Sequence, residues 1–265
     1  MRLADIGIDV DQLPGERNDW NDEGVVLLPG ALSDHEEALA DYERVWTEDC
    51  AGRHPEGWMQ PDGGWPDPTP YMRRPEIIRM LAPLADTLEE VLGGPAGLHL
   101  NLTGWQTTER DWHADQYLNP PHVGDHYVAL WLALEPINPD SGPFQYVPGS
   151  HRWPQVTQEK IWELLGTYDA RKWPKESERI LTPVYEAEVA ESGCVTYLPQ
   201  HRGDVLLWHG RLCHRGSKAK VPGMQRKAFI AHLSRVDSRP DMPAPAVQHE
   251  SGLWYFPIGA DRCAD

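Results

Sequence analysis

Basic residues are scarce in this chain. Among 265 residues there are 24 Lys and Arg against 41 Asp and Glu, which gives a formal net charge of −17. A surface with this charge repels the phosphates of nucleic acids and of anionic membranes, so we expect neither as a partner. The acidity instead indicates a soluble protein.

Cysteines and long apolar runs are also few. The four cysteines, Cys50, Cys194, Cys213 and Cys263, show no CxxC spacing. They predict free thiols in a reducing cytoplasm rather than a disulfide framework. The first residues, MRLADIGIDVDQL, carry acids inside their apolar stretch and do not resemble a signal peptide. No window approaches 18 uninterrupted apolar residues, so we expect no transmembrane helix.

The hydrophobic period changes near residue 97. Before it, helical spacing predicts helices over about 34–48 and 75–92, separated by a Pro- and Gly-rich loop at 52–71 that is long enough for a lid. After it, LHLNLTGW alternates, and further short apolar runs are separated by Gly and Pro turns. We therefore predict a mainly β protein, a jelly-roll or cupin-like double-stranded β-helix, with flanking N-terminal helices.

We expect a single domain with internal divisions. Residues 1–96 would supply helical support and the loop, 97–235 the jelly-roll core, and 236–265 a C-terminal segment. A charged stretch at 155–180 interrupts the strand pattern and predicts a helical insertion within the core.

Two short motifs contain possible metal ligands. WHAD supplies His113 and Asp115, and LCHRGS supplies His214. Two imidazoles and one carboxylate are the ligand set of the facial triad that holds non-haem Fe(II). If WHAD is extended, its two ligands leave the same face of the strand, and the third must come from a neighbouring strand. His209 is the rival third ligand; the GD that precedes both histidines and the distance to Arg226 favour His214.

Arg226 opens the apolar run QRKAFIAHL, which is typical of a strand. An arginine fixed near the third ligand would bind a dicarboxylate through two parallel hydrogen bonds. A metal triad together with a carboxylate anchor is much rarer than a His-x-Asp pair alone.

The combined motifs resemble the phytanoyl-CoA dioxygenase family of Fe(II)/2-oxoglutarate oxygenases. The resemblance covers about residues 98–235 and consists of WHAD, ALWLALEPINPDSGPFQYVPGSHRW and GDVLLWHGRLCHRGS followed by the arginine. It implies that Fe(II) binds His113, Asp115 and His214, and that Arg226 anchors the C5 carboxylate of 2-oxoglutarate. It also implies that Trp131 lies at the cosubstrate pocket.

Two further residues are weaker candidates for the cosubstrate pocket. The family often has serine two residues after the distal histidine, but here that position is Gly216 and the serine is Ser217. Gln106, with Thr108, lies just upstream of WHAD and could reach the pocket mouth. We count Ser217 and Gln106 as candidate cosubstrate contacts.

The resemblance implies a reaction in which O2 and 2-oxoglutarate give succinate and CO2 while a small-molecule substrate is hydroxylated. Asp115 favours hydroxylation over halogenation, because related halogenases replace this carboxylate with a small residue. The alternative is a cupin-like metal-dependent isomerase or hydrolase that does not use 2-oxoglutarate; Arg226 argues against it, since that chemistry needs no such anchor. The sequence indicates neither a particular substrate nor an oligomeric state.

Overall fold

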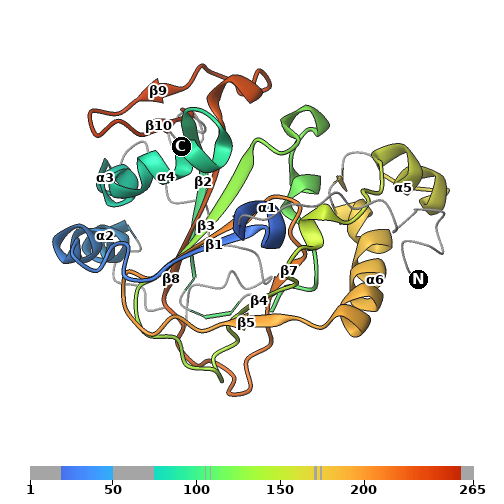
Figure 1. The fold of residues 1–265 in the computed structure, drawn as a ribbon, viewed down its shortest axis with the longest axis horizontal. Helices are drawn as coiled ribbons and strands as arrows, with labels where there is room; N and C mark the ends of the chain where they lie inside the picture. The colour runs from blue at the N-terminus through green and yellow to red at the C-terminus, as the bar shows by residue number, and fades with distance from the viewer. Residues whose placement is uncertain are drawn as a thin grey trace.

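The computed structural model describes residues 19–49, 75–104, 106–107, 109–169, 172–173 and 175–257. Two β-sheets form its centre (Figure 1). The larger has the strand order β1 (Val25–Leu28), β6 (Val205–His209), β3 (Tyr127–Ala133), β8 (Ala228–Arg235), β2 (Ala96–Gly104), β10 (Trp254–Tyr255) and β9 (Val247–Gln248). The smaller has the order β5 (Val195–Tyr197), β4 (Phe144–Tyr146) and β7 (His214–Gly216). Apart from the parallel pair β2–β10, neighbouring strands are antiparallel, and this arrangement confirms the predicted jelly roll.

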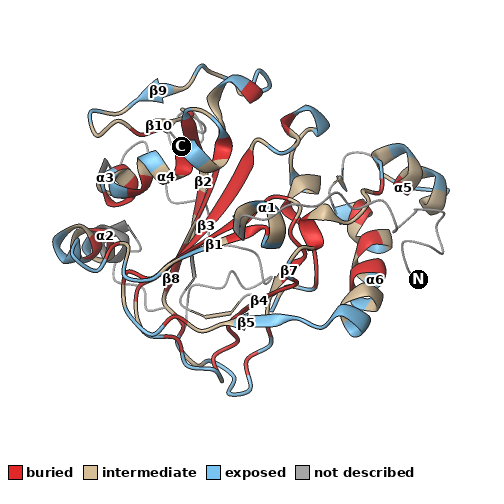
Figure 2. Ribbon diagram, in the orientation of Figure 1, coloured by how far each residue is buried: buried red, intermediate tan, exposed pale blue. Residues whose placement is uncertain are grey.

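Strand β3 shows why its sequence is apolar without a break, because all seven of its residues are buried (Figure 2). Val128, Leu130 and Leu132 pack toward the helices. Tyr127, Ala129, Trp131 and Ala133 alternate with them and pack with Phe144 and Tyr146 of the smaller sheet. A strand covered on both faces must be apolar at every position, and its second face forms the interior between the two sheets.

Helices cover the outer face of the larger sheet (Figure 1). They are α2 (Glu36–Asp49), α3 (Pro75–Leu81), the 3-10 turn Ala82–Leu84 and α4 (Ala85–Leu92), while α1 (Asp19–Glu23) lies apart from them, directly before β1. The single helix predicted over 75–92 is therefore interrupted, because Pro83 has no N–H to donate to the preceding turn.

The connection between β4 and β5 contains two helices, α5 (Gln158–Leu165) and α6 (Lys175–Ser192). Helix α6 thus continues past residue 180, where the predicted insertion ended, and it does so with Pro183 inside it. Leu181, Val184 and Tyr185 are buried on one side of the helix, and this tertiary packing carries the helix across the proline. They pack in one cluster with Trp112, Ala114 and Cys213, so the insertion lies against the segments that hold the candidate ligands.

Short 3-10 turns complete the fold at Asp115–Leu118, Pro121–Val123, Ser150–Arg152 and Val236–Ser238. The predicted loop 52–71 and Thr108 lie outside the described residues. Among the helices that are described, none combines the length and apolar character needed to cross a membrane. The division at residues 96 and 235 stays a prediction.

Candidate metal centre

The chain brings WHAD and the distal histidine together by backbone pairing. His113 and His214 form an isolated antiparallel bridge. The His113 backbone N–H donates to the His214 carbonyl oxygen at 3.1 Å, and the His214 N–H donates to the His113 carbonyl oxygen at 2.9 Å. Ala114 is extended, at φ −127° and ψ 138°. The side chains of His113 and Asp115 therefore leave the same face of the backbone, as the i, i+2 spacing predicts.

The three predicted ligand residues meet in one buried cluster. One potential ligand atom of each of His113, Asp115 and His214 lies within 4.8 Å of the others. Nε2 of His113 is 3.6 Å from Oδ1 of Asp115, and Nε2 of His214 is 3.7 Å from Oδ2. The Nδ1 atoms bond to backbone carbonyl oxygens, of Asp111 at 2.8 Å and of Leu212 at 3.0 Å. Donation from Nδ1 leaves the lone pair on Nε2, which faces the cluster and is free for a metal.

The protonation states also suit metal binding. Burial lowers the pKa of both His113 and His214, so both rings are neutral at pH 7. Burial alone would raise the pKa of Asp115, but the facing His214, His232 and His113, with Arg110, outweigh it and bring that pKa down to about 2. Neutral imidazoles and an ionised carboxylate are the forms that bind a divalent cation.

His209, the rival third ligand, points elsewhere. Its Nε2 lies 3.6 Å from Oδ1 of Asp125, and its Nδ1 accepts from the backbone N–H of Arg211 at 3.1 Å. Although only five positions separate it from His214, it ends β6 while His214 begins β7 in the other sheet.

Trp208 is a contact of the cluster that the sequence did not reveal. Its Nε1 donates to Oδ2 of Asp115 at 3.0 Å, in fully buried surroundings. Phe144 adds an apolar cover, because its ring stacks on His214 with centroids 5.2 Å apart and planes 21° apart. The only sequence signal for Trp208 is strand alternation, which places it with Leu206 on the inner face of β6.

Arg226 is buried, with only 3% of its surface exposed, and it lies two residues before β8. Its Nη1 donates to the carbonyl oxygen of Gly142, while its Nε finds no hydrogen-bond partner among the residues that the structure describes. Burial lowers the pKa of this guanidinium to about 10. Among the described residues no carboxylate forms an ion pair with it. A buried cation without a counter-ion is costly, so this side chain suits an incoming carboxylate.

The weaker candidates are placed as follows. Trp131 is buried on the inner face of β3 and meets Tyr197 edge to face at 5.8 Å. Ser217 uses its hydroxyl on the carbonyl oxygen of Pro143 at 2.7 Å, next to the Gly142 carbonyl that Arg226 contacts. Gln106 is partly buried, two residues after the end of β2. A role for these three in cosubstrate binding stays a prediction.

Comparison with known proteins connects this geometry to one family. A family model described as phytanoyl-CoA dioxygenase (PhyH) matches residues 85–228, more than half of the chain. The chain is 24% identical over 121 residues to the phytanoyl-CoA dioxygenase domain-containing protein 1 homolog of Caenorhabditis briggsae, covering 46% of this chain and 39% of the relative. It is 24% identical over 137 residues to the peroxisomal phytanoyl-CoA dioxygenase of Rattus norvegicus, covering 52% and 37%. These matches thus span about two fifths of the relatives' own length.

Solved structures share the fold. EctD from S. alaskensis with bound Fe superposes with a TM-score of 0.56 at 19% identity, covering 86% of this chain and 82% of that one. The epimerase SnoN in complex with Fe3+, alpha ketoglutarate and nogalamycin RO gives a TM-score of 0.57 at 19% identity, covering 82% and 81%. With the family model matched across both motifs, the chain belongs to the phytanoyl-CoA dioxygenase family.

Proposed function

We propose that this protein is an Fe(II)- and 2-oxoglutarate-dependent oxygenase that hydroxylates a small molecule. One observation carries the proposal: the same jelly roll contains a buried His, Asp, His cluster and a buried Arg226 that pairs with no carboxylate of the described residues. Family membership supports it. So do the structures of similar fold that contain Fe, in EctD, or Fe3+ and alpha ketoglutarate, in SnoN.

The residues have separate roles in this proposal. Nε2 of His113, Nε2 of His214 and the Asp115 carboxylate would hold Fe(II), the ligand set typical of a non-haem iron that also binds exogenous ligands. Fe(II) held there would supply, together with O2 and 2-oxoglutarate, the oxidising chemistry whose by-products are succinate and CO2. Arg226 neutralises the distal carboxylate of 2-oxoglutarate and so fixes the orientation of its keto acid end.

The surroundings keep water away from the reacting groups. Trp208 fixes one Asp115 oxygen and Phe144 covers the His214 ring, both from apolar positions between the sheets. Exclusion of water strengthens the electrostatic contacts within the site. The retained Asp115 carboxylate supports hydroxylation, and the substrate is a small molecule in this proposal. A cytoplasmic location stays a prediction.

The test is succinate formation from 2-oxoglutarate in air, with Fe(II) and ascorbate present. We expect turnover in the wild type, loss in His214→Ala, and retention in His209→Ala, which is the matched control five residues earlier, at the end of β6 in the other sheet. Loss in His209→Ala with retention in His214→Ala would show that the wrong histidine was assigned. Metal binding without any use of 2-oxoglutarate would instead support an isomerase or hydrolase.

A further inference from the structure

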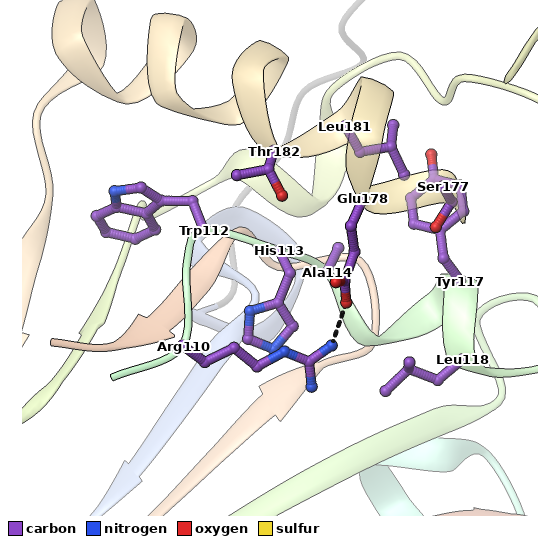
Figure 3. Close-up of a pocket in the computed structure, with 10 residues that line it drawn as sticks. All are labelled: Arg110, Trp112, His113, Ala114, Tyr117, Leu118, Ser177, Glu178, Leu181 and Thr182. Carbon is purple, nitrogen blue, oxygen red and sulfur yellow. Dashed lines mark hydrogen bonds and ion pairs between the residues drawn. The ribbon is translucent and has the colours of Figure 1, made fainter. Parts of the chain in front are cut away.

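The segment that carries the proposed ligands His113 and Asp115 is supported at its beginning by helix α6 (Figure 3). Helix α6 faces this segment across a small pocket, and Nη2 of Arg110 donates to Oε1 of Glu178 at 2.7 Å. This ion pair involves a residue that precedes His113, so it holds the segment before its first ligand. The part of the segment that follows Asp115 is held by different contacts, which come from the C-terminal part of the chain.

The part that follows Asp115 has few backbone donors of its own. Asp115 begins a 3-10 turn that ends at Leu118, and the next residue, Asn119, is followed by Pro120 and Pro121. The two prolines have no N–H to donate. Hydrogen bonds from side chains therefore carry more weight in fixing this part of the chain.

Asn119 connects Asp115 to a buried arginine of the C-terminal segment. Its Nδ2 donates to the backbone carbonyl oxygen of Asp115 at 3.3 Å, and its Oδ1 accepts from Nη1 of Arg239 at 3.3 Å. The direction of both bonds is fixed, because a guanidinium only donates and a carbonyl oxygen only accepts. The Arg239 side chain is 7% exposed, so the contacts that lead from Arg239 to the metal ligand start in the interior of the protein.

Arg239 is itself held from several directions. Its Nε and Nη2 donate to the two carboxylate oxygens of Asp241, at 3.0 and 2.9 Å, and its Nη1 also donates to the Ser234 hydroxyl at 3.2 Å. A bidentate pair of this kind has a fixed geometry. Asp241 in turn lies 3.1 Å from Nε2 of His122, which belongs to the same loop as Asn119. Because Ser234 lies in β8, Arg239 connects this loop to the larger sheet.

We infer that Arg239 is a positioning residue of the metal centre and that it acts through Asn119 on the backbone of Asp115. Trp208 fixes the carboxylate of Asp115, and the contact from Arg239 through Asn119 fixes the backbone from which that carboxylate extends. Contacts that orient a metal ligand contribute to metal affinity without touching the metal. The inference rests on the proposed function, since it takes Asp115 to be a metal ligand. It gives the C-terminal segment a role in metal binding.

The chain contains a matched control for this arginine. Two pairs of the form Arg-x-Asp lie beside the 3-10 turn Val236–Ser238, namely Arg235 with Asp237 and Arg239 with Asp241. In the described part of the chain the Arg235 side chain makes no hydrogen bond to residues 115–123. Arg235→Gln therefore removes the same charge and the same kind of ion pair without affecting the loop that follows the metal ligand.

The test measures metal binding to the full chain without 2-oxoglutarate, so it does not depend on turnover. Zn(II) affinity is measured against a competing chelator, and the visible absorption of bound Co(II) reports the coordination geometry. Arg239→Gln and Asn119→Ala should each weaken Zn(II) binding by roughly 2–10-fold, the effect of losing one hydrogen bond, and should change the Co(II) spectrum. Arg235→Gln should bind both metals as the wild type does.

The double variant Arg239→Gln/Asn119→Ala shows whether the arginine acts through the asparagine. If it does, the double variant binds Zn(II) no more weakly than Asn119→Ala alone, because both changes break the same series of contacts. Urea unfolding of the metal-free proteins measures the separate effect on stability. Asn119→Ala keeps the ion pair between Arg239 and Asp241, so it tests the contact even if Arg239→Gln does not fold.

Three results would overturn the inference and leave the metal site in place. They are Zn(II) affinity in Asn119→Ala equal to that in Arg235→Gln, affinity in a folded Arg239→Gln equal to that in Arg235→Gln, and additive losses in the double variant. Zn(II) binding that is unchanged in Asp115→Ala would overturn both the inference and the proposed metal centre. Succinate release is assayed separately: the expected pattern of Zn(II) affinities in a protein that does not use 2-oxoglutarate would overturn the oxygenase proposal alone.

Discussion

The hydrogen bond from Trp208 to Asp115 gives the sharpest prediction. In the structure the indole N–H reaches Oδ2 at 3.0 Å, and Trp208 is only 2% exposed. The bond leaves Oδ1, which faces His113, as the carboxylate oxygen without this contact. We expect Trp208 to hold Asp115 in a monodentate orientation, so that the second oxygen does not take a coordination position meant for cosubstrate or O2.

Trp208→Phe removes the donor and keeps a ring at the site. A hydrogen bond to a charged group contributes about 1.5–3 kcal/mol. That energy corresponds to a loss of roughly 10–100-fold in metal affinity, the range typical when an outer contact of a metal ligand is removed. The smaller ring also leaves a void, which lowers the free energy of unfolding by a further amount that does not depend on Asp115.

Trp131→Phe is the control for the void, because Trp131 is equally buried on the same inner surface. Metal affinity is measured by titration of Zn(II) or Fe(II) against a competing chelator, without 2-oxoglutarate. The free energy of unfolding of the metal-free proteins is measured with urea. Equal metal affinity in Trp208→Phe and Trp131→Phe would refute the proposed role, whatever the two variants do to stability.

Three other predictions concern the same interior. Arg226→Ala should raise the 2-oxoglutarate concentration needed for half-maximal activity, because about 2–5 kcal/mol of binding free energy is lost, and should leave Zn(II) affinity nearly unchanged. An unchanged 2-oxoglutarate concentration would contradict the role of Arg226 as the carboxylate anchor. Gly142→Ala should also weaken 2-oxoglutarate binding, because Gly142 has φ +80° and an added Cβ would lie 2.5 Å from the Ser217 carbonyl oxygen, which displaces the segment that Arg226 contacts. Wild-type affinity for 2-oxoglutarate in this variant would show that the segment does not position Arg226. Finally, burial lowers the pKa of six histidines, and that of His209 falls to about 3; the six are His99, His113, His151, His209, His214 and His232. Below pH 6.5 the unfolded chain therefore binds more protons than the folded chain. The free energy of unfolding of the metal-free protein should therefore fall as pH falls from about 6.5 toward 3, and a flat urea midpoint over that range would contradict neutral buried histidines.

Local pattern was enough to predict the kind of fold and the kind of site. Alternation in LHLNLTGW and the continuous apolar run around Trp131 indicate strands, because side chains on a strand alternate between two faces whatever the rest of the chain does. The residue types and spacing of His113 and Asp115 likewise indicate metal chemistry without knowledge of the tertiary structure.

Some features depended on contacts that local pattern does not report. Pro83 divides the helix predicted over 75–92, whereas Pro183 does not end α6, because Leu181, Val184 and Tyr185 are buried against the WHAD segment. The intrinsic effect of proline is the same in both places. Tertiary packing decided the outcome.

The completed site was also decided by long-range pairing. The bridge between His113 and His214 spans about a hundred residues, and its register selects His214 over His209. The same folding brings Trp208 to Asp115, buries Arg226 where no described carboxylate pairs with it, and sets Glu178 against Arg110. A sequence determines which groups are available and which face of a strand they occupy. Which of those groups meet is determined by the register between distant strands and by the docking of the insertion. Register and docking depend on the burial of apolar surface over the whole molecule, which local pattern does not report.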